Sequence, residues 1–353
     1  MATEGEPLDM EVDRRVESEL GDEEGKKIKV VEIATNDEAH PSLTDGENGS
    51  DLAGEAQTPV DMETFTLDPE AEDVDLNHLR IGKIEGFEVL KKVKILCLRQ
   101  NLIAKIENLD ELKTLRELDL YDNAVKTIEN LDALHDLEIL DLSFNAIRKL
   151  EGLTNLTKLR KLFLVNNKIT KIENVGHLLE LEMLELGSNR IRVIENIETL
   201  AKLDSLFLGK NKITKLQNLE GLTNLTVLSL QSNRITKIEG LQNLLNLKEL
   251  YLSHNGIEII EGLESNKKLT TLDLAANKIK KLENISHLME LQEFWMNDNL
   301  IENWSDLDEL KNAKKLETVY LEHNPLQKDP QYRRKIMLAL PSVRQIDATF
   351  SRF

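Results

Sequence analysis

Leucine and isoleucine recur along most of this chain in a regular pattern whose period is about 22 residues. From residue 74 the pattern is L-x-x-L-x-L-x-x-N-x-I-x-x-I-E-N-L, in which most x positions are polar. The alternation in L-x-L predicts a short strand whose two leucines share one face. The second half of the unit predicts a return segment of 3₁₀ turns or short helix. We therefore expect one strand-and-return unit, repeated many times.

The residue between the two leucines of L-x-L shows how regular the repeat is. Eleven copies follow one another at a constant interval, and a twelfth comes after a slightly longer one. The residues at this position are Asp75, Cys97, Asp119, Asp141, Phe163, Glu185, Phe207, Ser229, Tyr251, Asp273, Trp295 and Tyr320. Four places further on, every copy but the first has an asparagine, whose amide both donates and accepts hydrogen bonds. We expect these asparagines to form a ladder that satisfies backbone groups in the turns.

The pattern resembles the leucine-rich repeat, because a period of about 20–29 residues with L-x-x-L-x-L-x-x-N is the signature of that solenoid. The resemblance implies an α/β fold: a horseshoe-shaped leucine-rich-repeat solenoid of about twelve 22-residue repeats with a parallel sheet on its concave face. The return segments need more room than the strands, which lie about 4.8 Å apart, so the strands line the inner side. The residue between the two leucines then points into the hollow.

The ends of the chain depart from the repeat and divide it into three parts. Residues 1–70 contain 21 Asp/Glu against 5 Lys/Arg and few apolar residues, which predicts a disordered acidic tail. Residues 71–325 are expected to form the solenoid with its N-terminal cap, and residues 326–353 the C-terminal cap.

The C-terminal cap is predicted to contain one helix. Asp329, which a proline follows, reads as the N-cap of this helix. Tyr332, Ile336 and Leu340 would share one helix face, and the next proline would end the helix. We expect this face to cover the leucines of the last repeat.

The residues between the paired leucines, which we call the concave stripe, are unusual for a surface that faces solvent. The stripe carries five of the fourteen aromatic residues of the chain, namely Phe163, Phe207, Tyr251, Trp295 and Tyr320. Carboxylates stand between and beside them, at Asp119, Asp141, Glu185, Asp273, Glu249 and Glu293. We expect the rings to bury little of one another, because Phe163 and Phe207 are two strands, about 10 Å, apart. Aromatic anchors surrounded by charge predict a docking surface for a protein that offers Lys or Arg.

The sequence contains no pattern typical of catalysis. It has no Gly-rich phosphate loop, no G-x-S-x-G and no H-E-x-x-H, and no two histidines stand three or four residues apart. Cys97 is the only cysteine, and we interpret it as an ordinary surface or interface residue. We therefore expect no enzyme activity, no catalytic residues, no cofactor and no metal site.

Charge and hydropathy exclude two kinds of partner. Of the net charge of −19, most belongs to residues 1–70, because the 43 acidic residues that follow are nearly balanced by 40 basic ones. We therefore expect no nucleic-acid binding, which depends on clustered Lys and Arg. No apolar run is long enough to span a bilayer and no secretory signal opens the chain, so we expect no membrane partner and a nuclear or cytosolic location.

A closer resemblance covers the solenoid and its cap. The outer-bend sequences KIENLDEL, TIENLDAL and KIENVGHL, and the run WMNDNLIENWSDLDELKNAKKLETVYLEHNPLQKDPQYRRKIMLALPSVRQIDATF, are similar to the leucine-rich-repeat regulatory subunits of the Ser/Thr protein phosphatase 1. The resemblance implies a non-catalytic subunit whose concave face binds the phosphatase catalytic subunit and controls its activity, maturation and localisation, including in mitosis. It also implies a location in nucleus and cytoplasm, and a ternary complex with a second, disordered phosphatase inhibitor.

The family's contact positions map onto residues of this chain. They are Asp141, Phe163, Glu185, Phe207, Asp273, Glu293, Trp295 and Tyr320, to which the concave stripe adds Tyr251. Ser18, between two glutamates, is a candidate phosphorylation site. An alternative function is an acidic leucine-rich-repeat scaffold or chaperone for basic proteins, which would bind through the tail. Deleting residues 1–70 would abolish binding by a chaperone that acts through the tail, and it would preserve binding by a subunit that acts through its concave face.

Overall fold

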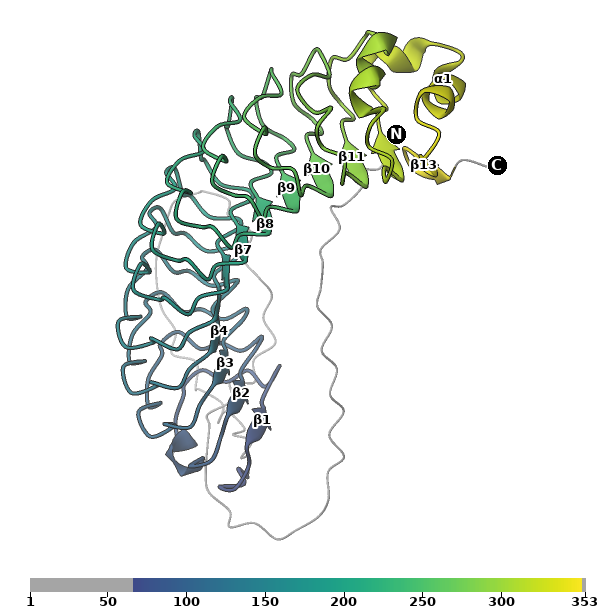
Figure 1. Cartoon of the computed structure of the whole chain (residues 1–353). Helices are drawn as coiled ribbons and strands as arrows, with labels where there is room; N and C mark the ends of the chain where they lie inside the picture. Colours follow the sequence, from purple (N-terminus) through teal and green to yellow (C-terminus); the bar gives the residue numbers. More distant parts are fainter. Residues whose placement is uncertain (1–65, 351–353) are drawn as a thin grey trace, which may run out of the picture.

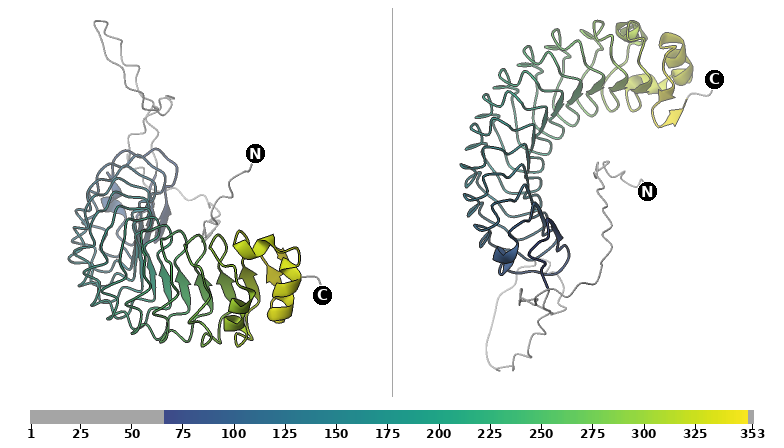
Figure 2. Two further views of the ribbon diagram at one scale, coloured as in Figure 1. Left: turned by 90° about the horizontal axis from the view of Figure 1, so that it is seen from above. Right: turned by 60° about the horizontal axis from the view of Figure 1, so that its bottom comes forward.

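The computed structural model describes residues 66–350, which form a single curved solenoid. The strands lie side by side along the inner side of the arc, and the return segments fan out along the outer side (Figure 1). Figure 2 shows the solenoid from above in its left view, and the right view, turned so that the bottom comes forward, shows the open arc again. Residues 1–65 of the predicted acidic tail, including Ser18, lie outside the described residues, so these predictions remain untested there; the described part begins at Thr66, and Leu67 is buried.

The sheet has fourteen strands in sequence order, twelve of which are the predicted L-x-L strands. These twelve are β1 (Asp73–Asp75), β2 (Ile95–Cys97), β3 (Glu117–Asp119), β4 (Ile139–Asp141), β5 (Lys161–Phe163), β6 (Met183–Glu185), β7 (Ser205–Phe207), β8 (Val227–Ser229), β9 (Glu249–Tyr251), β10 (Thr271–Asp273), β11 (Glu293–Trp295) and β12 (Thr318–Tyr320). All twelve are parallel, and each concave-stripe residue pairs with the next in register. Two strands that the sequence did not predict, β13 (Gln345–Ile346) and β14 (Thr349–Phe350), continue the sheet and end it as an antiparallel hairpin.

The core of the solenoid is aliphatic, as the repeat predicts. In β5 the middle residue Leu162 and the following Leu164 are fully buried, whereas Phe163 between them is partly exposed. The same alternation holds in β6, β9 and β11, whereas in β3, β7, β8 and β10 one residue beside the middle leucine is buried as well. Because successive side chains of a strand point to opposite sides, the middle residue faces the core and its neighbours face the hollow.

One polar residue takes a leucine position in this core. Asn266 is fully buried where the neighbouring repeats have Leu244 and Leu288. Its Nδ2 donates to the carbonyl oxygens of Leu241 and Leu244, each at 3.0 Å, while its Oδ1 has no hydrogen-bond partner among residues 66–350.

The predicted asparagine ladder is present at the turns that follow the strands. Oδ1 of Asn189 accepts the backbone N–H of Ile169 at 3.0 Å, and its Nδ2 donates to the carbonyl of Leu164 at 2.9 Å. Both partners belong to the preceding repeat, so each side chain joins two repeats. Buried peptide groups that have no partner in the sheet are satisfied in this way.

A second ladder, which the sequence did not predict, runs along the outer bend. The asparagine of I-E-N-L adopts a left-handed conformation, as at Asn196 with φ 60°, and its Nδ2 donates to the carbonyl of Ile172 at 2.7 Å. Where glycine replaces this asparagine, the outer-bend backbones of neighbouring repeats approach more closely. At Gly152, φ is 67° and a Cβ would stand 2.2 Å from the carbonyl oxygen of Ile128, so only glycine fits.

The return segments are mostly turns with hydrogen bonds between residues three apart, such as Leu181 N–H to Leu178 O at 3.0 Å. Among the described residues, three stretches lengthen into 3₁₀ helices, η1 (Phe87–Val89), η2 (Trp304–Leu310) and η3 (Pro325–Lys328). No helix within residues 66–350 is both long and apolar enough to cross a membrane.

The predicted C-terminal helix is α1 (Tyr332–Ala339), and the prediction of its N-cap was wrong by two residues. Gln331, not Asp329, holds the N-cap position. Asp329 instead ends η3, and its carboxylate accepts the N–H of Gln331 at 2.9 Å. The proline after Asp329 is therefore part of a tight connection between two short helices. Tyr332 and Ile336 face the core as predicted.

The ladder at the strand turns gives a stability prediction. Asn189→Ala should lower the free energy of unfolding by about 1–3 kcal/mol, because buried backbone groups of the preceding repeat lose their partners. Urea denaturation measures this change. The exposed Asn155, whose amide reaches only Asp132, is the control, and Asn155→Ala should change stability by no more than about 0.5 kcal/mol. Equal effects of the two substitutions would contradict the role of the ladder.

Candidate functional site

The concave stripe is formed by the last residue of each strand from β1 to β12. Because the middle residue of each strand is buried in the core, the residues on either side of it point into the hollow. Register places Asp141, Phe163, Glu185 and Phe207 next to one another on β4 to β7. The predicted site residues therefore all stand on the strands that line the inner side of the arc (Figure 2), on β4 to β7 and β9 to β12.

The aromatic residues at the C-terminal end of the stripe pack against one another, and here the expectation of separate rings was wrong. The ring of Trp295 lies 6.3 Å from that of Tyr251 and 5.9 Å from that of Tyr320, both edge to face. Trp295 and Tyr251 are two strands apart, but their side chains are long enough to meet above the smaller Asp273. The result is a cluster of three partly exposed rings on β9, β11 and β12.

Polar contacts hold this cluster in place. The hydroxyl of Tyr251 donates to Oε2 of Glu249 at 2.8 Å, and Nε2 of Gln345 donates to the hydroxyl of Tyr320 at 2.9 Å. Nε1 of Trp295 is buried and has no hydrogen-bond partner among the described residues. The cluster is therefore preorganised, with one donor left unsatisfied.

The aspartates of the stripe have a structural role that the sequence analysis did not anticipate. The carboxylate of Asp141 accepts the N–H of Ser143 at 2.8 Å, and that of Asp273 accepts the N–H of Ala275 at 3.0 Å. Asp119 makes the same contact with Tyr121 at 2.9 Å. An aspartate side chain has the right length to accept a hydrogen bond from the backbone N–H two residues further along the chain. It thereby stabilises the turn after the strand. Asp273 is only 4% exposed and stands between Tyr251 and Trp295 in the register.

Glu185 differs from these aspartates because its longer side chain makes no hydrogen bond within the described residues. It stands between Phe163 and Phe207 in the register. Burial, together with repulsion from Asp141, raises the pKa of its carboxyl group to about 7. Burial likewise raises the pKa of Asp119 to about 7, and those of Asp141 and Asp273. A cation placed in the hollow would stabilise the ionised form of these carboxyl groups.

Sequence reasoning missed a second aromatic group, on the rim of the hollow beside Asp119. The ring of Phe144 lies 4.9 Å from that of Tyr121, and the guanidinium of Arg99 stacks over Tyr121 at 4.3 Å. Phe144 has φ 54° and is 39% exposed. These residues lie in the turns after β2, β3 and β4, but Phe144 stands one repeat position beyond Tyr121, so the repeat gave no signal for their contact.

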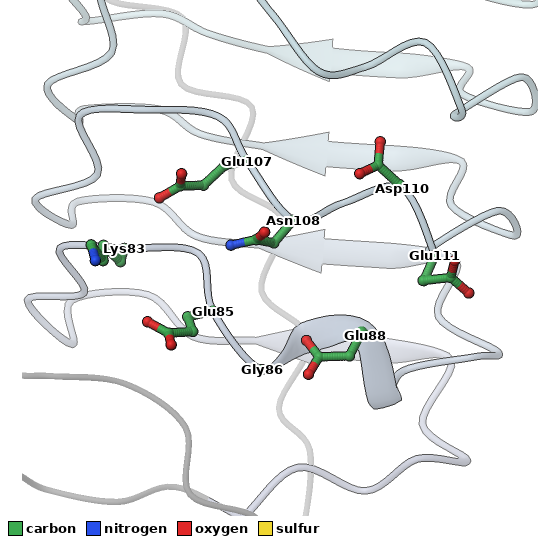
Figure 3. Close-up of a pocket in the computed structure, with 8 residues that line it drawn as sticks. All are labelled: Lys83, Glu85, Gly86, Glu88, Glu107, Asn108, Asp110 and Glu111. Carbon is green, nitrogen blue, oxygen red and sulfur yellow. The ribbon is translucent and has the colours of Figure 1, made fainter.

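The structure offers no catalytic centre within residues 66–350. Burial raises the pKa of the Cys97 thiol to about 12, which makes it a poor nucleophile. No three potential metal ligands gather in the described part of the chain. A shallow hollow of about 490 Å³ on the outer side is lined by Lys83, Glu85, Gly86, Glu88, Glu107, Asn108, Asp110 and Glu111. Its carboxylates point in different directions and do not converge on one point (Figure 3).

Comparison with known proteins first defines the class. Family models described as "Leucine Rich repeats (2 copies)" match residues 201–243, 223–265 and 245–287, and one described as "Leucine-rich repeat" matches residues 109–181. The crystal structure of an internalin from Listeria monocytogenes shares the fold with a TM-score of 0.65 at 24% identity, covering 82% of this chain and 91% of that one. The chain is a leucine-rich-repeat protein.

Curated relatives then define the family. The chain is 82% identical over 347 residues to "Protein phosphatase 1 regulatory subunit 7" of Homo sapiens, covering 98% of this chain and 96% of the relative. It is 81% identical over 349 residues to the protein of the same name from Danio rerio, covering 99% of this chain and 98% of the relative. The chain therefore belongs to the protein phosphatase 1 regulatory subunit 7 family.

The raised pKa of Glu185 predicts that this residue lowers the free energy of unfolding at high pH but not at low pH. The group is neutral at low pH in both the folded and unfolded states, and it must ionise in a partly buried place as pH rises from about 4.5 to about 7. Its contribution to the free energy of unfolding therefore falls across this window. Glu185→Gln should stabilise the protein at pH 8 and have little effect at pH 4.5, measured by urea denaturation at both values. A stabilisation that is the same at both pH values would show that ionisation is not its cause.

Proposed function

We propose that this protein is a non-catalytic regulatory subunit that binds the catalytic subunit of protein phosphatase 1 through its concave face. The names of its full-length relatives supply the partner. The observation that supports the surface is the row of aromatic and acidic side chains along one continuous side of the sheet. Contact with such a row requires a rounded partner that reaches several strands at once.

The dimensions of the hollow fit a folded domain. Twelve strands at about 4.8 Å span on the order of 55 Å along the arc. A compact domain of about 300 residues has a diameter near 50 Å. The rings would insert into apolar depressions of the partner, while Glu185 and Glu293 would meet its Lys or Arg side chains.

The chemistry of the surface supports regulation by binding. The acidic groups lie side by side on an open sheet, and none is placed to attack a substrate. A protein of this kind controls its partner's activity, maturation and localisation by occupying its surface. This proposal has four further parts: localisation in nucleus and cytoplasm, a role in mitosis, phosphorylation at Ser18, and a ternary complex with a second inhibitor. Imaging would test the localisation, and co-purification from mitotic cells would test the other three.

The concave site is tested by removing three of its rings. Phe163→Ala, Phe207→Ala and Trp295→Ala together should weaken binding of the phosphatase catalytic subunit at least about 100-fold, because aromatic anchors dominate such interfaces. Calorimetry with purified catalytic subunit measures the affinity, and circular dichroism verifies the fold.

The matched control removes three exposed apolar side chains from the return segments. Leu179, Leu245 and Met289 are 55%, 58% and 59% exposed there. Their joint replacement by alanine should leave the affinity within about threefold of the parent. Unchanged binding by the ring variant, or equal loss in both variants, would refute the concave site.

A further inference from the structure

One flank of the horseshoe carries a concentration of positive charge that the proposed function does not use. It is formed by the loops after β5, β6, β7 and β8, at residues 165–171, 187–193, 209–215 and 231–237. We call these four loops the basic flank. They contain nine Lys and Arg residues and no Asp or Glu, namely Lys168, Lys171, Arg190, Arg192, Lys210, Lys212, Lys215, Arg234 and Lys237.

The four loops lie directly beside one another. The N–H of Asn166 donates to the carbonyl of Gly187 at 3.0 Å, that of Ser188 to Gly209 at 2.9 Å, and that of Lys210 to the carbonyl of Gln231 at 2.8 Å. Cations at equivalent positions of successive repeats therefore become neighbours in space. The fields of adjacent like charges add, so this flank attracts negative charge.

The described part of the chain leaves most of this charge uncompensated. Lys171 pairs with Glu173 at 3.9 Å and Lys237 with Glu239 at 4.0 Å, and the other seven cations make no ion pair within residues 66–350. On the return segments, by contrast, Lys158 pairs with Asp136 at 2.5 Å.

The matching negative charge is in the same chain. Residues 1–65 contain 19 Asp/Glu against 5 Lys/Arg, whereas the rest of the chain is nearly neutral. These residues join the solenoid at Thr66, beside β1, about 25 Å from the middle of the flank at the usual strand spacing. Sixty-five residues have a contour length on the order of 200 Å, so the connection reaches every loop of the flank.

We propose that the basic flank is the docking surface for the acidic segment 1–65 of the same chain. Covalent connection gives the two an effective concentration on the order of millimolar, which favours a weak electrostatic contact. The contact should be screened by salt, because seven of the nine cations of the flank are exposed and the other two, Lys168 and Lys212, are partly exposed. An acidic segment held along this edge would lie beside the concave stripe without covering it.

Cross-linking of the full-length protein tests this proposal. A carbodiimide joins lysine amines to carboxylates that touch them, and peptide mapping locates each link. Links from Asp and Glu of residues 1–65 should concentrate on Lys168, Lys210, Lys212 and Lys215, and their yield should fall in high salt. Mixing ¹⁴N- and ¹⁵N-labelled protein distinguishes links within a chain from links between two copies.

Two charge-matched variants provide the control. Arg190→Glu, Arg192→Glu and Arg234→Glu reverse charge in the flank but keep its lysines as reporters, and should lower those links at least about fivefold. Lys113→Glu, Lys267→Glu and Lys314→Glu alter the net charge equally on the return segments and should leave the yield unchanged. Links spread over exposed lysines of both flanks, links unaffected by the flank variant, or links mainly between copies would overturn the proposal.

Discussion

The hydrogen-bonded register between successive repeats is the constraint on which this structure depends. Each repeat alone has a three-residue strand and a few leucines, which is too little to bury a core. The repeat becomes stable only when its strand pairs with the next and its asparagine reaches into the preceding turn. The longer last repeat shows where the unit tolerates a change in length: its extra residues lie in the return segment around η2, while the pairing of β11 with β12 and the contact of Asn324 with the preceding turn are kept.

The same register creates the surfaces on which the protein acts. Because equivalent positions stack, a choice of residue type at one position of the repeat becomes a continuous column on the molecule. One column is the concave stripe with its rings and carboxylates, and another is the basic flank. The two columns are adjacent but chemically opposite, so the proposed acidic segment and the proposed protein partner would bind to separate faces.

Most of the fold could be predicted from the sequence because the period itself determines it. The strands, the buried leucines, the asparagine ladder and the direction of Phe163 all follow from the repeat. The hairpin of β13 and β14 did not, because two-residue strands carry no pattern. The start of α1 was misplaced because an aspartate before a proline can also connect two short helices.

The site was less predictable, because strand spacing alone does not give side-chain contacts. Trp295 reaches across Asp273 to Tyr251, which a distance estimate between backbones excludes. Asp141 and Asp273 bond the turns that follow them, which depends on side-chain length and not on the repeat. The rim group of Tyr121 and Phe144 has no counterpart in other repeats, so no column revealed it.

The central claim, that the phosphatase catalytic subunit sits in the hollow, is tested most directly by ¹⁹F NMR of the two tryptophans. Trp295 lies in the concave cluster, whereas Trp304 packs against Tyr332 in the C-terminal cap and serves as the internal control. In protein labelled with 5-fluorotryptophan, adding unlabelled catalytic subunit should shift the Trp295 resonance and leave that of Trp304 in place. A complex that forms while the Trp295 resonance stays unchanged would contradict the account.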